Sequence, residues 1–286
     1  MGASQYQNST FNYNQSSEGG AIGQSNGPLT VSGSTFEYNT AIIRNSSIGG
    51  AVYIYQTNPQ ANPTFTNDTF YQNTAFQDAS GIYSDFQYSS KTIPSDTTNL
   101  LNSTLLQNKV THPGSTSGNN IDGLLVTRFD YTIAYYVHYA IANSVISDYG
   151  QTANVGNCGQ KVEIIDNGHN WEEDQSSSFV TNSCGLNGSW GSTVPTWPSP
   201  VLLPLGSNGG PTYTAAINTS NDTVTTFSPL IDNVPGPNCP ATDQTGSARP
   251  DNVLGFPNNN NCDIGAVEVG SYKPVVNTLD DQDLGN

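Results

Sequence analysis

The chain has 286 residues, of which 10% are charged and 10% are aromatic, whereas about 25% of residues are charged in an average protein. Few charges combined with many aromatic side chains exclude a disordered chain and indicate a folded all-β protein with a neutral polar surface. The formal net charge of −16 excludes nucleic acids and anionic membranes as partners, because phosphate binding needs clustered Lys and Arg. No segment approaches the roughly 20 apolar residues of a membrane helix, so we expect no membrane insertion.

The N-terminal segment already belongs to a repeat. Met1 and Gly2 lead directly into the first repeat copy, without the charged and apolar regions of a signal peptide. We therefore expect the natural protein to extend further upstream. A solenoid whose first coil has no cap exposes strand edges and core. Residues 3–31 thus predict either association between copies of the chain or an upstream segment that covers this end.

A short motif recurs along residues 1–147: a polar residue, Thr, and then Phe or Leu, with Asn three residues after the Phe position. Its copies are Asn8-Ser9-Thr10-Phe11, Gly33-Ser34-Thr35-Phe36, Asn67-Asp68-Thr69-Phe70, Asn102-Ser103-Thr104-Leu105 and the degenerate Asn143-Ser144-Val145-Ile146. Repeats at intervals of about 20 to 50 residues are typical of solenoids. The unequal intervals indicate a constant coil that carries loops of variable length.

Each motif position predicts a column along the solenoid. Because side chains alternate along a strand, the Phe position points inward and the Thr position points outward. The predicted core column is Phe11, Phe36, Phe70 and Leu105, and the predicted outer column is Thr10, Thr35, Thr69 and Thr104. The Asn position follows where the strand turns, and Asn tolerates left-handed backbone there. We expect Asn14, Asn39, Asn73 and Asn108 to form an amide ladder between coils.

A second element follows each motif, consisting of a small-residue corner and an apolar strand. It reads Gly19-Gly20-Ala21-Ile22, Gly49-Gly50-Ala51-Val52 and Ser80-Gly81-Ile82-Tyr83. Glycine within strands marks tight corners, and the Asn-Gly or Asp-Gly pairs of hairpins are largely missing. We therefore predict a parallel β-helix for residues 1–147. An antiparallel sandwich or jelly roll is the alternative.

Residues 148–270 predict a loop-rich region held by disulfides. The four cysteines allow three pairings, and we predict the nearest-neighbour one, Cys158 with Cys184 and Cys239 with Cys262. No C-x-x-C spacing for a metal is present. Disulfides indicate an oxidising compartment.

The last third of the chain resembles a known family through an ordered set of motifs. These are Pro204-Leu205-Gly206 with Gly209-Gly210-Pro211, Ser228-Pro229-Leu230-Ile231-Asp232, Thr242-Asp243-Gln244 with Arg249-Pro250, and Cys262-Asp263-Ile264-Gly265-Ala266-Val267-Glu268. Together they are similar to the C-terminal region of secreted bacterial β-helix surface proteins of the choice-of-anchor Q type. The resemblance implies a right-handed parallel β-helix and a location outside the cell or on its surface. Residues 271–286 are then a linker or tail.

Candidate chemistry is sparse. His169, Trp171 and Glu172 form the best local group for binding. Asp243 with Arg249 predicts a structural ion pair that closes the C-terminal loop, and the spacing of Asp281 and Asp283 resembles the start of a calcium loop whose remaining ligands are missing. We expect no catalytic residues, metal or cofactor.

The expected function is that of a non-catalytic extracellular protein, structural or adhesin-like. Its expected partners are cell-surface glycans, proteins or copies of itself. One alternative is a carbohydrate-active β-helix, a lyase or hydrolase. A second alternative is a flat-faced binder, such as an ice-binding solenoid, that uses the outer Thr column.

Overall fold

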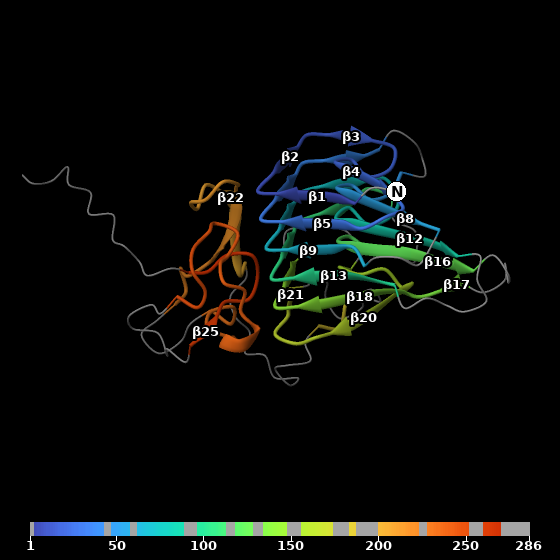
Figure 1. Ribbon diagram of the computed structural model, residues 1–286. Coiled ribbons are helices and arrows are strands. Elements are labelled where there is room, and N and C mark those ends of the chain that lie inside the picture. The colour runs from blue at the N-terminus through green and yellow to red at the C-terminus, as the bar shows by residue number, and fades with distance from the viewer. Residues whose placement is uncertain are drawn as a thin grey trace, which may run out of the picture.

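The computed structural model describes residues 3–42, 47–57, 62–88, 96–112, 118–127, 134–147, 156–173, 183–186, 200–222, 228–251 and 260–269. The first part of the chain winds into stacked coils, and each coil adds one strand to each of several parallel sheets (Figure 1). The predicted parallel β-solenoid is confirmed. An antiparallel sandwich is wrong, because the motif strands pair in parallel with the strands of the neighbouring coils.

Four sheets run along the solenoid. The first contains β1 (Ser4–Gln7), β5 (Leu29–Ser32), β9 (Thr64–Thr66), β13 (Thr97–Leu101), β18 (Val137–Ala142) and β20 (Val162–Asp166). The second contains β2 (Thr10–Asn12), β6 (Thr35–Glu37), β10 (Thr69–Tyr71), β14 (Thr104–Leu106), β19 (Val145–Ser147) and β21 (Trp171–Glu173). The third contains β3 (Gln15–Ser16), β7 (Thr40–Ala41), β11 (Thr74–Ala75) and β15 (Lys109–Val110). The fourth contains β4 (Ile22–Ser25), β8 (Val52–Gln56), β12 (Ile82–Tyr88) and β16 (Ile121–Thr127), with β17 (Ala134–Tyr135) antiparallel at its edge.

The inward column of the second sheet forms the centre of the core. Phe11 stacks on Phe36 with ring centroids 4.7 Å apart, and Phe36 stacks on Phe70 at 4.6 Å, both with nearly parallel planes. Leu105 pairs in register with Phe70 and is fully buried. Aliphatic and aromatic side chains of the first and fourth sheets close the core around this column. Offset aromatic stacking adds to the hydrophobic stabilisation of these coils.

The corners of each coil use left-handed backbone. Between the first and second sheets the corner residues have φ values between 46° and 61°, and they are Asn8, Gly33, Asn67, Asn102 and Asn143. Between the second and third sheets the left-handed residues are Tyr13, Tyr38, Gln72 and Gln107. Each of them precedes a ladder Asn, so the prediction that the ladder Asn itself takes the left-handed conformation is wrong. The corner residue makes the turn, and the next residue directs its amide toward the adjacent coil.

The solenoid continues beyond residue 147, where the sequence motif fades. β20 and β21 extend the first and second sheets by one more coil. In this coil Trp171 pairs with Val145 and Glu172 pairs with Ile146, so a polar residue occupies the inward position where the motif has Phe. The sequence pattern therefore ends one coil earlier than the structure.

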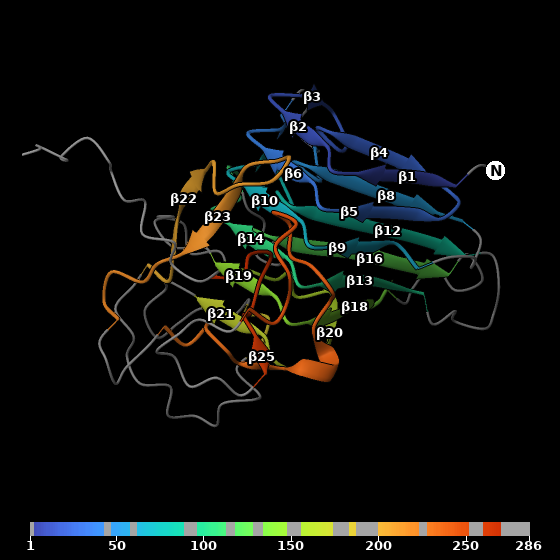
Figure 2. The same cartoon turned by 60° about the vertical axis from the view of Figure 1, so that its left-hand side comes forward.

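The C-terminal region, defined here as residues 200–222, 228–251 and 260–269, packs against the outer face of the second sheet (Figures 1 and 2). It contains two antiparallel pairs, β22 (Leu202–Gly206) with β23 (Thr214–Ile217), and β24 (Val234–Pro235) with β25 (Asn261–Cys262), and a 3-10 turn at Gly236–Asn238. Its apolar side chains form a second core with the outward residues Tyr71, Leu106, Val145 and Trp171.

The two disulfides join Cys158 to Cys184 and Cys239 to Cys262, which confirms the predicted nearest-neighbour pairing. The first links the last coil to residues 183–186, and the second joins β25 to the 3-10 turn before it. Residues 271–286, the predicted linker or tail with Asp281 and Asp283, lie outside the described residues.

Candidate functional site

The Asn positions form a continuous ladder of side-chain hydrogen bonds along the interior. Each Asn Nδ2 donates to the Oδ1 of the next member at 2.6 to 2.9 Å, and the members are Asn14, Asn39, Asn73, Asn108, Asn120 and Asn157. The backbone N–H groups of Asn14, Asn39 and Asn73 donate to the same oxygens. Asn120 and Asn157 lie outside the repeat motif, so the sequence pattern did not identify them. All members except Asn14 are fully buried, and a buried hydrogen-bond network of this kind fixes the spacing of the coils.

A parallel ladder uses the Ser or Asp position of the motif. The backbone N–H of each member donates to the side-chain oxygen of the next member, and the members are Ser9, Ser34, Asp68, Ser103, Ser144 and Asn170. Asp68 accepts from Ser34 N and from Thr66 N. Its complete burial raises the pKa of the Asp68 carboxyl well above its ordinary value. This carboxylate is therefore part of the scaffold.

Glu172, a predicted binding residue, lies at the end of the core. Its Oε1 accepts from Cys184 N at 2.8 Å and from Asn157 Nδ2 at 3.2 Å, and its Oε2 accepts from Ser183 Oγ at 2.8 Å and from Leu186 N at 3.3 Å. The side chain thus ends the Asn ladder and holds residues 183–186 across the last coil. Its acceptor capacity is used inside the protein.

The structure does not bring His169, Trp171 and Glu172 together in one site. Trp171 and Glu172 are neighbours in one strand and point to opposite faces. The Trp171 ring is buried beneath the C-terminal region, and His169 sits at a corner with φ of 54°, level with Asn143. The three residues are close in the sequence, which predicted a cluster, but the alternation of side chains along the strand and the corner at His169 place them apart.

The outer Thr column is covered by the C-terminal region. The Thr35 hydroxyl donates to Tyr213 O, Thr69 donates to Gln244 Oε1 at 2.6 Å, and Thr104 Oγ1 accepts from Ala266 N at 3.1 Å. Of the four predicted positions, Thr10 alone is exposed. The expectation of an open threonine face is therefore wrong. The hydroxyls dock the C-terminal region, which sequence periodicity could not show.

The predicted Asp243–Arg249 ion pair is wrong for the described residues, because Arg249 pairs with Glu268 inside a larger buried cluster. Arg249 donates to the backbone oxygens of Asp263 and Gly265 at 3.2 and 2.7 Å, and its Nε lies 3.5 Å from Glu268 Oε2. Glu268 accepts from Asp251 N and Asp263 N, and its own N–H donates to Asp243 Oδ2. Burial, together with the neighbouring Glu268 charge, raises the pKa of Asp263 to about 8. The cluster closes the C-terminal region.

An open groove lies on the outer face of the fourth sheet, on the side of the solenoid that carries β4 and β8. It has a volume of about 420 Å³ and is lined by Glu18, Gly23, Gln24, Ser25, Tyr53 and Tyr55. Gly23 pairs in register with Tyr53, and Ser25 pairs with Tyr55. Because the residues beside the two rings are small, each ring has open space along one face.

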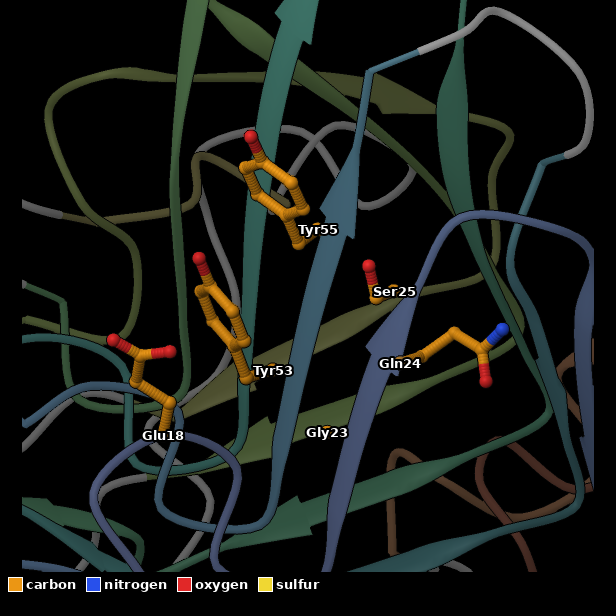
Figure 3. Close-up of a pocket in the computed structure, with 6 residues that line it drawn as sticks. All are labelled: Glu18, Gly23, Gln24, Ser25, Tyr53 and Tyr55. Atoms are coloured by element: carbon orange, nitrogen blue, oxygen red, sulfur yellow. The ribbon is translucent and has the colours of Figure 1, made fainter.

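Three side chains of the groove, Glu18, Tyr53 and Tyr55, lie close together on one side of β8 (Figure 3). In Figure 3 the carboxylate of Glu18 and the rings of Tyr53 and Tyr55 lie on the same side of β8, whereas the Gln24 side chain points away. Both rings are partly exposed. On the next strand Tyr83 stacks against Tyr53 at 6.1 Å with an interplanar angle of 24°. Tyr83 thereby supports the Tyr53 ring from the β12 side.

One carboxylate, Glu18, lines the groove, and a second, Asp85, lies behind the Tyr53 hydroxyl. The Tyr53 hydroxyl donates to Asp85 Oδ2 at 3.0 Å, and Gln87 Nε2 donates to both Asp85 oxygens at 3.1 Å. Burial raises the pKa of the Asp85 carboxyl, and the negative charge of Glu18 raises it further. Burial and the Asp85 charge likewise raise the pKa of Tyr53. Asp85 therefore orients Tyr53, and Glu18 supplies charge to the groove.

Sequence reasoning missed this groove. The available signal is the alternation of Gly23-x-Ser25 and Tyr53-x-Tyr55. These segments become neighbours only through the register of β4 on β8, and the intervening loop hides that register.

No helix with the length and hydropathy of a membrane span occurs in the described ranges. Among the same residues, no group of three or more His, Cys, Asp or Glu side chains is arranged to hold a metal ion. No family model matches the chain, and there is no significant match among curated proteins or solved structures. The fold and the groove geometry therefore carry the functional argument.

Proposed function

We propose that the protein is an extracellular β-solenoid that binds carbohydrate, without cleaving it, in the groove of Glu18, Tyr53 and Tyr55. The observation that carries this proposal is the pairing of two partly exposed tyrosine rings with small neighbours and a carboxylate. Aromatic rings offer apolar faces with a polar tip, which suits the C–H faces and hydroxyl groups of a sugar. Few polar groups placed among aromatic walls are typical of ligand sites.

The extracellular location is supported by two disulfides, because disulfides persist mainly in oxidising compartments. The C-terminal motifs, with their resemblance to the choice-of-anchor Q type, support the same location. Under this proposal the solenoid holds the groove at a fixed distance from the cell surface. The two interior ladders stiffen the coils that carry it.

A binding role is favoured over a carbohydrate-active enzyme by how the buried carboxylates are used. Glu172 and Glu268 each accept hydrogen bonds from two backbone N–H groups, so their oxygens serve the fold. Beside the groove, the buried Asp85 accepts hydrogen bonds from Tyr53 and Gln87. A hydrolase needs one carboxylate to protonate the leaving group and a second to act as base or nucleophile.

The test is a glycan array followed by titration calorimetry with the strongest oligosaccharide. Tyr55→Ala should weaken binding about tenfold, because the ring provides a wall of the groove and makes no side-chain hydrogen bond within the described residues. Tyr136→Ala is the matched control, since Tyr136 is 55% exposed and does not line the groove. Unchanged affinity of Tyr55→Ala would refute the site. Release of shorter oligosaccharides, detected by chromatography, would refute the non-cleaving role and favour the enzyme.

A further inference from the structure

We infer that the groove selects carbohydrate chains that carry protonated amino groups, such as oligomers of glucosamine. This inference rests on the proposed function and specifies its ligand class. It depends on the position of one carboxylate, Glu18, relative to the Tyr53 ring.

Glu18 is the carboxylate of the groove that remains available to a ligand. Asp85 is largely buried, and its oxygens accept from Tyr53 and Gln87. The Glu18 side chain is exposed and makes no hydrogen bond within the described part of the chain. Figure 3 places its carboxylate beside the Tyr53 ring. A ligand donor at this point would meet an acceptor that the fold does not use.

The charge of the groove favours a cation. Burial is the main cause of the raised pKa of Tyr53 and of Asp85, and the negative charge of Glu18 raises both further, so this charge reaches the side chains around the Tyr53 ring. The six lining residues include no Lys or Arg, and the whole chain has a formal net charge of −16. An ammonium group between Glu18 and the Tyr53 face would gain an ion pair and a cation–π contact at once. A uronate chain would meet like charge in the same place.

The two open ring faces suit a chain more than a single sugar. Tyr53 and Tyr55 are two residues apart in β8, so they project from the same face of the sheet about 7 Å apart along the strand. Gly23 and Ser25 leave space beside both rings. Neighbouring sugar units can then pack on the two rings, with the amino group of one unit at Glu18.

The test compares three soluble oligomers of equal length by calorimetry at 0.15 M salt: glucosamine, N-acetylglucosamine and galacturonate. The glucosamine oligomer should bind at least tenfold more tightly than the acetylated one, and the galacturonate oligomer should not bind. Glu18→Gln keeps the shape of the side chain and should reduce this preference about tenfold. Glu163→Gln removes the same charge from the first sheet, where Glu163 contacts His138, and should leave the preference unchanged.

Three outcomes separate the inference from the proposed function. If the acetylated oligomer binds as tightly as glucosamine and Glu18→Gln changes neither, the inference falls and carbohydrate binding stands. If Glu163→Gln weakens glucosamine binding as much as Glu18→Gln, the attraction comes from net charge and the inference also falls. If neither glucosamine nor any glycan on the array binds, both the inference and the proposed function fall.

Discussion

The central Asn of the interior ladder provides the sharpest test of how the coils are held together. Asn73 is fully buried. Its Nδ2 donates to Asn108 Oδ1 at 2.9 Å and to Phe36 O at 3.0 Å. Its Oδ1 accepts from Asn39 N at 3.0 Å and from Asn39 Nδ2 at 2.9 Å. Asn73→Ala removes all four hydrogen bonds and leaves a buried backbone N–H without its side-chain acceptor.

Each lost hydrogen bond costs about 1 kcal/mol, and a buried group left unsatisfied costs about 1–3 kcal/mol. We therefore expect Asn73→Ala to lower the free energy of unfolding by about 3–5 kcal/mol, measured by urea denaturation followed by circular dichroism. Asn14→Ala is the matched control at the exposed end of the same ladder. The Asn14 side chain makes one hydrogen bond within the described residues, from its Nδ2 to Asn39 Oδ1. The expected loss in the free energy of unfolding is therefore below about 1 kcal/mol.

Asn73→Asp tests the hydrogen bonds that Asn73 donates separately from those that it accepts. The carboxylate keeps acceptors for Asn39 but faces the oxygens of Asn108 and Phe36 without a proton to donate. Its destabilisation should shrink at low pH, where the protonated carboxyl donates one hydrogen bond. Equal small losses, below about 1 kcal/mol, for Asn73→Ala and Asn14→Ala would refute the buried ladder.

Three further predictions concern the core, the buried acids and the second disulfide. Phe70→Ala should cost about 3–5 kcal/mol in urea melts, since Phe70 is fully buried between Phe36 and Leu105; a loss below about 1 kcal/mol would place the column at the surface. Burial raises the folded-state pKa of Asp68, Asp85 and Asp263 above their unfolded values, so their contribution to stability is complete below about pH 4 and is lost as pH rises through the folded values. The free energy of unfolding should therefore fall between pH 4 and about 8, where Asp263 titrates, and a constant or rising stability over this interval would contradict the assignment. Replacing Cys239 and Cys262 together by Ala should cost about 3 kcal/mol because they are 23 residues apart; peptide mapping without reductant should recover the Cys239–Cys262 peptide from the native chain, and free thiols would contradict it.

The sequence by itself determined the repeating part of this protein. The recurrence of Thr and Phe, followed by Asn, predicts strands, an inward Phe column and an Asn ladder, because alternation and turn chemistry act within a few residues. Once the repeat copies are aligned in register in neighbouring coils, Phe36 stacks on Phe70 and Asn39 donates a hydrogen bond to Asn73. The cysteine order likewise indicated the disulfide pairing, although not which surfaces the disulfides would hold.

Tertiary structure decided the role of each face. Period-2 alternation shows that Thr69 points outward, but not that Gln244, 175 residues later, covers it. Alternation also does not predict that Glu172 ends the Asn ladder. An inward carboxylate is stable there only because backbone N–H groups of residues 183–186 donate hydrogen bonds to it.

The candidate groove depends on the same kind of long-range information. Tyr53 pairs with Gly23 of the neighbouring coil, and the intervals between neighbouring coils vary from 25 to 41 residues. Local sequence sets the conformation of each strand. The register between coils depends instead on the conformations of loops of unequal length and on the side-chain packing that those conformations allow. For that reason the sequence predicts the scaffold, and only the folded chain shows the surface that can bind a ligand.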